Sequence, residues 1–231
     1  MKYNNIVYND VANGEGMRIS FFTQGCSHKC EGCFNKELGW DFNGGSEFTK
    51  DKLDEIMFVF KSFQNGYNGL SILGGEPFDN YIVSTILIDT FRNEFGNTKT
   101  IWIYSGYTYE QILQDKNKMK ILSKCDVLVD GKFIKELYNP NIKFRGSSNQ
   151  RIIDVVKSIK QNKIGYPEIN HFNQSQSSGQ NPYEQEESKM IDKNIVMTII
   201  NHFKGELDSK NNNDRIALTI LGNIINKIKR L

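Results

Sequence analysis

Three of the four cysteines lie close together in the string Cys26-Ser-His-Lys-Cys30-Glu-Gly-Cys33, which directly follows the apolar run Ile19-Ser20-Phe21-Phe22. Three thiolates can bind three irons of a [4Fe–4S] cluster and leave the fourth iron without a protein ligand. Catalytic metal sites likewise keep one coordination position open for a substrate. This cysteine loop (residues 26–33) therefore predicts a cluster with chemistry at its open iron.

Zinc and disulfides are the alternative uses of these cysteines. A structural zinc site normally has four Cys or His ligands in two pairs, and the only further donor nearby is His28, which would crowd Cys26 and Cys30. Disulfides are disfavoured because the set is odd and the first residues do not resemble a secretion signal. We therefore expect reduced thiols in the cytoplasm.

Composition limits the class of protein. The chain has 231 residues, of which 38% are hydrophobic and 24% are charged, as is typical of soluble globular proteins. No apolar run approaches the roughly 18 to 20 residues that span a bilayer. The net charge of +2 comes without a basic stripe. We expect neither a membrane nor a nucleic acid as partner.

Short apolar runs alternate with helix-period stretches over the first part of the chain, which predicts α/β architecture with a mostly parallel sheet. A helix over residues 53–63 with Thr49 as its N-cap and a second helix over residues 83–91 follow from the spacing of apolar side chains. The expected strands are Arg18–Thr23, Leu70–Leu73, Thr100–Tyr104 and Val127–Asp130.

Three loops follow successive expected strands: the cysteine loop, the turn Gly74-Gly75-Glu76-Pro77, and Ser105-Gly106. Ligands of parallel α/β sheets gather at the carboxyl ends of the strands, so these loops should meet at one edge. The two glycines would let backbone approach a ligand, and Glu76 offers a carboxylate that suits an ammonium group. An ordinary strand-to-helix turn is the alternative interpretation of the glycine pair.

The composition changes after about Lys157. Residues 171–188 are rich in Asn, Gln, Ser and Glu, and two apolar stripes at helical spacing follow them. We expect a catalytic domain over residues 1–156, a polar linker over residues 157–188, and a helical extension of unknown role over residues 189–231.

The Cys-x3-Cys-x2-Cys loop followed by Gly-Gly-Glu-Pro resembles the radical S-adenosylmethionine (SAM) enzymes. Within that superfamily, further strings between Asn4 and Asp154 are similar to the activating proteins of anaerobic ribonucleoside-triphosphate reductases, which are glycyl-radical enzyme activases. These strings are Asn13-Gly14-Glu15-Gly16-Met17-Arg18, Gly32-Cys33-Phe34-Asn35, Tyr104-Ser105-Gly106-Tyr107, Asp126-Val-Leu-Val-Asp130-Gly131 and Phe144-Arg145-Gly146-Ser147-Ser148-Asn149-Gln150-Arg151.

The resemblance implies a fold, a set of ligands and a binding site. The fold would be an incomplete parallel βα barrel of radical SAM type, followed by the polar linker and helical extension. Cys26, Cys30 and Cys33 would hold the cluster, and SAM would chelate its open iron. The implied SAM contacts are Gly74, Gly75 and Glu76 at the methionyl ammonium, and backbone of Gly32, Cys33 and Phe34 at the adenine. Many superfamily members have an aromatic residue where this chain has Gly32.

The resemblance also implies a reaction and partners. The reduced cluster would cleave SAM to methionine and a 5′-deoxyadenosyl radical, which would abstract the Cα hydrogen of a glycine in the anaerobic reductase. A flavodoxin or ferredoxin would supply the electron. The cofactors carry this oxidoreductase chemistry, so we expect no catalytic side chain. The alternatives are activation of another glycyl-radical enzyme, a small-molecule radical SAM reaction, or a non-catalytic zinc or electron-transfer module.

The sequence leaves more than one role possible for each of four further residues. His28 would either shield the cluster or lie in solvent, and Cys125 is more typical of a small buried residue than of a fourth ligand. Arg18 and Arg145 would either bind the SAM carboxylate, dock the partner or form surface ion pairs.

Overall fold

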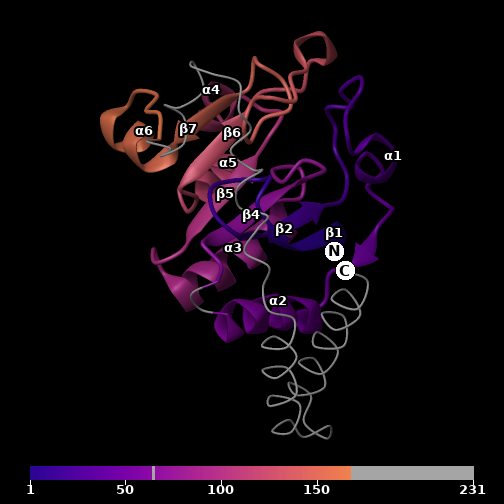
Figure 1. Cartoon of the computed structure of the whole chain (residues 1–231), viewed down its shortest axis with the longest axis vertical. Helices are drawn as coiled ribbons and strands as arrows, with labels where there is room; N and C mark the ends of the chain where they lie inside the picture. The colour runs from indigo at the N-terminus through magenta and orange to yellow at the C-terminus, as the bar shows by residue number, and fades with distance from the viewer. Residues whose placement is uncertain (64–65, 168–231) are drawn as a thin grey trace, which may run out of the picture. The chain divides into compact units, whose positions relative to one another are not determined.

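The computed structural model describes residues 1–63 and 66–167 (Figure 1). The predicted helical extension and most of the predicted polar linker lie outside the described residues. Among the helices that are described, none has the length and apolarity needed to cross a bilayer.

A seven-stranded mixed sheet organises the described part of the chain, in the order β3-β1-β2-β4-β5-β6-β7. Four central strands, β2, β4, β5 and β6, run parallel, whereas β1 and β7 flank them antiparallel and β3 pairs antiparallel with β1. The strands are β1 (Lys2–Asp10), β2 (Arg18–Thr23), β3 (Ser46–Glu47), β4 (Gly69–Gly74), β5 (Thr100–Tyr104), β6 (Val127–Asp130) and β7 (Arg151–Asp154).

The helices connect these strands. They are α1 (Lys36–Gly39), α2 (Lys50–Ser62), α3 (Tyr81–Phe95), α4 (Tyr109–Leu113), α5 (Lys116–Leu122) and α6 (Val155–Gln161), with a short 3-10 helix, η1, at Lys135–Leu137. Thr49 caps α2 as predicted, because its side chain accepts a hydrogen bond from the Lys52 amide. Figure 1 shows α2 below the strands of the sheet and the segment between β6 and β7 above them.

The two faces of the sheet differ in role because successive strand side chains alternate between them. On one face, paired residues of β2, β4 and β5 are fully buried with the apolar sides of α2 and α3, and they form the main core: Ile19, Phe21, Leu70, Ile72, Ile101 and Ile103. On the other face, Phe22, Leu73 and Tyr104 line a cavity. Trp102, Val127, Val129 and Ile152 pack together beside it.

The α/β class and all four predicted strands are confirmed, with β4 one residue longer at each end than expected. The sheet is less parallel than expected because β1, β3 and β7 are antiparallel. Helix α6 runs across residue 156, where the first domain was expected to end, and continues to Gln161.

Candidate active site

A cavity of about 490 Å³ lies at the carboxyl ends of the parallel strands. The three loops that the sequence placed at one edge all line it: the cysteine loop after β2, Gly74-Gly75-Glu76 after β4, and Ser105-Gly106 after β5. The volume falls within the range of about 300 to 1,000 Å³ that is usual for small-molecule sites. The convergence follows from the parallel register of β2, β4 and β5.

All three cysteines of the loop are partly buried, free and exposed to the cavity. Burial raises the pKa of the Cys26 thiol to about 11 and also raises the pKa of Cys30. Ligation requires the thiolate, so binding of a metal would be coupled to proton release. The Cys33 amide donates to the Cys30 carbonyl at 3.3 Å, which folds the second half of the loop into a turn.

The donor set fits an iron–sulfur cluster. Within residues 1–63 and 66–167, no three Cys, His, Asp or Glu side chains meet closely enough to hold one metal ion. A cluster makes a different demand, because each cysteine binds its own iron and the thiolates need only face a shared space. Cys26, Cys30 and Cys33 do face the same cavity.

Gly74 and Gly75 are required by the chain's own packing. Gly74 has φ of +101°, and a Cβ there would lie 2.7 Å from the backbone of Phe22. A Cβ on Gly75 would lie 2.3 Å from the carbonyl oxygen of Gly25. The glycines therefore let the turn after β4 lie directly against the start of the cysteine loop, while their backbone still lines the cavity.

Glu76 is buried, with an exposed fraction of 1%. Its Oε1 accepts hydrogen bonds from the Ser105 hydroxyl at 2.9 Å and from the Phe78 amide at 3.1 Å. Its Oε2 accepts from the Gly106 amide at 2.8 Å and lies 3.1 Å from His28 Nε2. The carboxylate thus connects the turn after β4 to the loop after β5 and to the cysteine loop.

Phe34 is the most exposed large aromatic residue at the cavity, with 71% of its surface accessible. Its ring makes edge-on contacts with Phe133 and Tyr138, at centroid distances of 5.6 and 5.7 Å. Cys33 also lines the cavity, whereas Gly32 is exposed and lies outside the lining. The segment between β6 and β7 therefore forms one wall of the site beside the cysteine loop.

The four residues with open roles divide into two pairs. His28 and Arg145 line the cavity, and burial lowers the pKa of Arg145. Arg18 and Cys125 are fully or nearly fully buried and take no part in the lining. Cys125 is the small buried residue that the sequence favoured, since its thiol lies 3.5 Å from the Ile121 carbonyl and burial raises its pKa.

Sequence reasoning missed several cavity residues. Ala12 and Asn13 line the cavity because the segment between β1 and β2 lies against the cavity face of the sheet. There the Ser71 hydroxyl donates to the Asn13 carbonyl. Tyr104 also lines the cavity, and its buried hydroxyl has no hydrogen-bond partner among the described residues. Asn13 and Tyr104 belong to strings that were noted for their resemblance, but only the fold shows that they line the cavity.

Known proteins and one protein family match the same region of the chain that forms this cavity. The family described as "4Fe-4S single cluster domain" matches residues 12–153. The anaerobic ribonucleoside-triphosphate reductase-activating proteins of Vibrio cholerae and Escherichia coli K12 are each 36% identical to this chain, over 154 and 152 residues. These matches cover 66% and 65% of this chain, and 97% and 96% of the relatives. The activating protein of enterobacteria phage T4 is also 36% identical, over 66% of this chain and 93% of its own length.

Proposed function

Because this chain belongs to the 4Fe-4S single cluster domain family and to the anaerobic ribonucleoside-triphosphate reductase-activating proteins, we propose that it is a radical SAM activase. It would activate an anaerobic ribonucleoside-triphosphate reductase by installing a glycyl radical. One observation carries this proposal: three cysteines with no other assigned role share one cavity with the Gly74–Glu76 turn.

In this proposal Cys26, Cys30 and Cys33 hold a [4Fe–4S] cluster whose fourth iron binds SAM. When bound and reduced, the cluster supplies the electron that cleaves SAM to methionine and a 5′-deoxyadenosyl radical, which takes the Cα hydrogen of the target glycine. The protein holds the ligands, orients SAM and excludes water. The four parallel strands β2, β4, β5 and β6 would be the incomplete barrel of this enzyme class.

The cavity offers several groups for the parts of SAM. Backbone at Gly74 and Gly75 is available to the methionyl ammonium, and Arg145 supplies a cation for the carboxylate. Phe34 and the backbone of Cys33 remain the proposed adenine contacts. The unpartnered Tyr104 hydroxyl is available to a ligand polar group.

Anaerobic reconstitution with iron and sulfide tests the proposal. After addition of dithionite and SAM, 5′-deoxyadenosine is measured for the wild type, for Cys30→Ala and for Cys125→Ala. Cys125 is a matched control because it is a free cysteine outside the cavity. We expect product with the wild type and Cys125→Ala, and loss of product with Cys30→Ala.

The partner is tested with the same reconstituted protein. Incubation with an anaerobic reductase and SAM should produce the electron paramagnetic resonance (EPR) doublet of a glycyl radical, with flavodoxin or ferredoxin replacing dithionite as electron donor. SAM cleavage without this radical would favour another glycyl-radical enzyme or a small substrate. A zinc-loaded protein that leaves SAM intact would overturn the enzyme proposal.

A further inference from the structure

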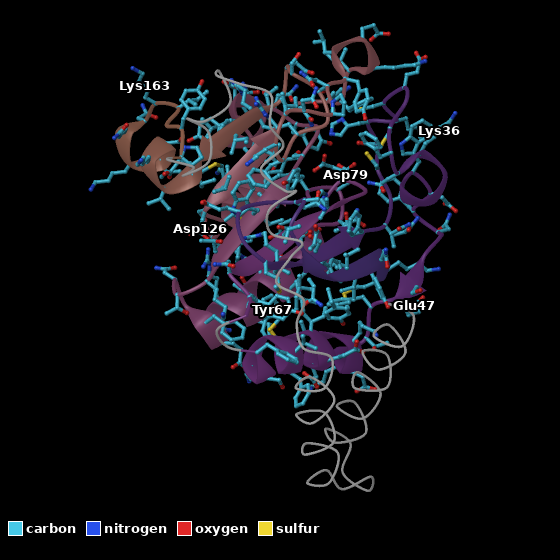
Figure 2. All side chains as sticks on the ribbon, viewed as in Figure 1. Lys36, Glu47, Tyr67, Asp79, Asp126 and Lys163 are labelled. Atoms are coloured by element: carbon cyan, nitrogen blue, oxygen red, sulfur yellow. The ribbon has the colours of Figure 1, made fainter. Side chains whose placement is uncertain are left out.

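The turn between β4 and α3 contacts the start of the cysteine loop through several polar side chains. Figure 2 labels Asp79, which belongs to this turn, in the same upper part of the view as Lys36, which follows the cysteine loop. Three polar side chains of the turn, those of Glu76, Asp79 and Asn80, reach toward residues 25–28.

Cys26 lies between two backbone groups that this turn holds. The Gly25 carbonyl accepts hydrogen bonds from the Glu76 amide and from Asn80 Nδ2, each at 2.9 Å. The Ser27 amide donates to Asp79 Oδ2 at 2.9 Å. Backbone on both sides of the Cys26 ligand is therefore anchored to the same turn.

The two carboxylates also hold the loop that follows β5. Glu76 accepts from the Ser105 hydroxyl and the Gly106 amide, and Asp79 Oδ1 accepts from the Tyr107 hydroxyl at 2.8 Å. The His28 ring packs edge-on against Tyr107, with centroids 4.4 Å apart. Glu76 and Asp79 thus connect all three loops that line the cavity.

Burial determines what Glu76 can do. At 1% exposure its two oxygens already receive three hydrogen bonds from the protein, and loss of one acceptor would leave a buried donor unsatisfied. A ligand ammonium would have to displace contacts that hold the site together. This geometry favours a supporting role over direct contact with SAM.

We propose that Glu76 and Asp79 are positioning residues that preorganise the Cys26 end of the cysteine loop before the cluster and SAM bind. The inference rests on the proposed function for the identity of those ligands. It assigns to the carboxylate of Glu76 a role different from the ammonium contact that the resemblance implies, and it assigns a role to Asp79, which the sequence did not single out. Supporting contacts of this kind commonly change metal affinity by about 10-fold or more.

Amide hydrogen exchange in the apo protein tests the preorganisation directly. In Asp79→Ala the Ser27 amide loses its acceptor, so its exchange should accelerate, whereas Asp79→Asn keeps an oxygen that can accept from Ser27 and should exchange like the wild type. In Glu76→Gln an NH2 group that cannot accept replaces one carboxylate oxygen, so either the Gly106 amide or the Phe78 amide loses its acceptor, and exchange at one of these two amides should accelerate. Asp89→Ala and Glu55→Gln are matched controls, because both acids pair outside the cavity.

Retention of the cluster is the second measurement. Reconstituted proteins are mixed with an iron chelator without SAM, and iron release is followed together with the EPR spectrum and the thermal midpoint. We expect Asp79→Ala and Glu76→Gln to release iron about 10-fold faster than the wild type, with the controls and Asp79→Asn close to the wild type. A thermal midpoint near that of the wild type would assign the change to the loop and not to general unfolding.

Two results would overturn the inference. One is unchanged exchange and iron release in both Asp79→Ala and Glu76→Gln. The other is weaker SAM binding by Glu76→Gln with normal exchange and iron release, as a direct ammonium contact requires. Failure of the wild type to bind a cluster or to cleave SAM would instead count against the proposed function, while the apo exchange result would still report on the loop.

Discussion

At the residue scale, Arg18 shows how burial decides the role of a charged side chain. Its guanidinium is fully buried and donates to the Ser71 hydroxyl, to the Thr100 hydroxyl, and to the carbonyls of Glu15, Leu70 and Thr100. Burial lowers its pKa to about 10, so it remains charged at neutral pH. Arg18 therefore fastens the segment before β2 to β4 and β5, and it is not available to SAM or to a partner.

Replacement of Arg18 by Met should destabilise the protein by about 3 kcal/mol, because several buried acceptors lose their donor together. The measurement is the free energy of unfolding from urea titration of the apo protein. Lys120→Met, at an exposed position on α5, is the control and should change this free energy by no more than about 0.5 kcal/mol. Equal effects of the two substitutions would contradict the assigned role.

Arg151 links two carboxylates across neighbouring elements. It donates to Asp130 from Nε at 2.9 Å and to Glu110 from Nη1 and Nη2 at 3.0 and 2.8 Å. The hydrogen bond from Arg151 is the main reason that the pKa of Glu110 falls to about 2. Because this folded-state pKa lies below the ordinary value, ionised Glu110 stabilises the folded protein.

This stabilisation should be fully present above the unfolded pKa of about 4.3 and disappear as the pH falls toward 2. Glu110 is 54% exposed, so solvent screening limits its contribution to about 1 kcal/mol at pH 7. We expect Glu110→Gln to be less stable than the wild type at pH 7. The two free energies of unfolding should converge as the pH falls from about 4.3 to about 2, which are the unfolded and folded pKa values of Glu110. A difference that stays constant with pH would exclude this linkage.

At the element scale, the sequence predicted the buried parallel strands well and the peripheral elements poorly. Strands such as β5 and β6 are compact apolar runs, because burial on both faces demands apolar residues throughout. Strand β1 is only half-buried and carries five polar residues in its first half and at its end, so its pattern resembles a loop. These residues are Lys2, Asn4, Asn5, Asn9 and Asp10. Helix α6 was not predicted from the sequence, because only two of its seven residues, Val155 and Ser158, are buried and its apolar pattern is weak.

The contacts of α6 predict where the folded unit ends. Asp154 caps the helix by accepting from the Lys157 amide at 2.8 Å, and its own amide donates to the Gly165 carbonyl at 2.9 Å. The Gly165 amide donates in turn to the Ser158 hydroxyl at 2.9 Å. A chain ending at residue 156 should therefore be about 2 to 3 kcal/mol less stable than one ending at residue 167, at roughly 1 kcal/mol for each lost hydrogen bond. Coincident urea unfolding curves for the two chains would show that α6 contributes nothing.

At the scale of the whole molecule, the candidate site is contained in one part of the chain. All residues that line the cavity fall between Ala12 and Gln150, within the family match at residues 12–153. The relatives from Vibrio cholerae and Escherichia coli K12 are matched over almost their whole lengths by about two thirds of this chain. We therefore propose that the chemistry needs no residue beyond the described part.

Removal of Asn170–Leu231 should leave cluster binding and SAM cleavage at wild-type levels, because none of the cavity lining is lost. The measurement is 5′-deoxyadenosine formed per cluster by the truncated and the full-length protein. A truncated protein that is folded and carries its cluster but does not cleave SAM would show that the removed residues take part in catalysis.

The sequence by itself predicted a set of cluster ligands and determined the order of the loops around them. Cys26, Cys30 and Cys33 are informative without a structure, because clustered thiols report metal chemistry through residue type and spacing alone, and the parallel strands before them place the loops at one edge. Only the tertiary structure decided which polar side chains face the cavity and which support it. The sequence alone does not distinguish the roles of Arg18 and Arg145, yet Arg18 is fully buried and Arg145 lines the cavity. Likewise, the Glu76 carboxylate accepts hydrogen bonds from Ser105 and Gly106, which are 29 and 30 residues away in the chain. Burial and hydrogen bonding depend on these long-range neighbours, which local sequence patterns do not contain.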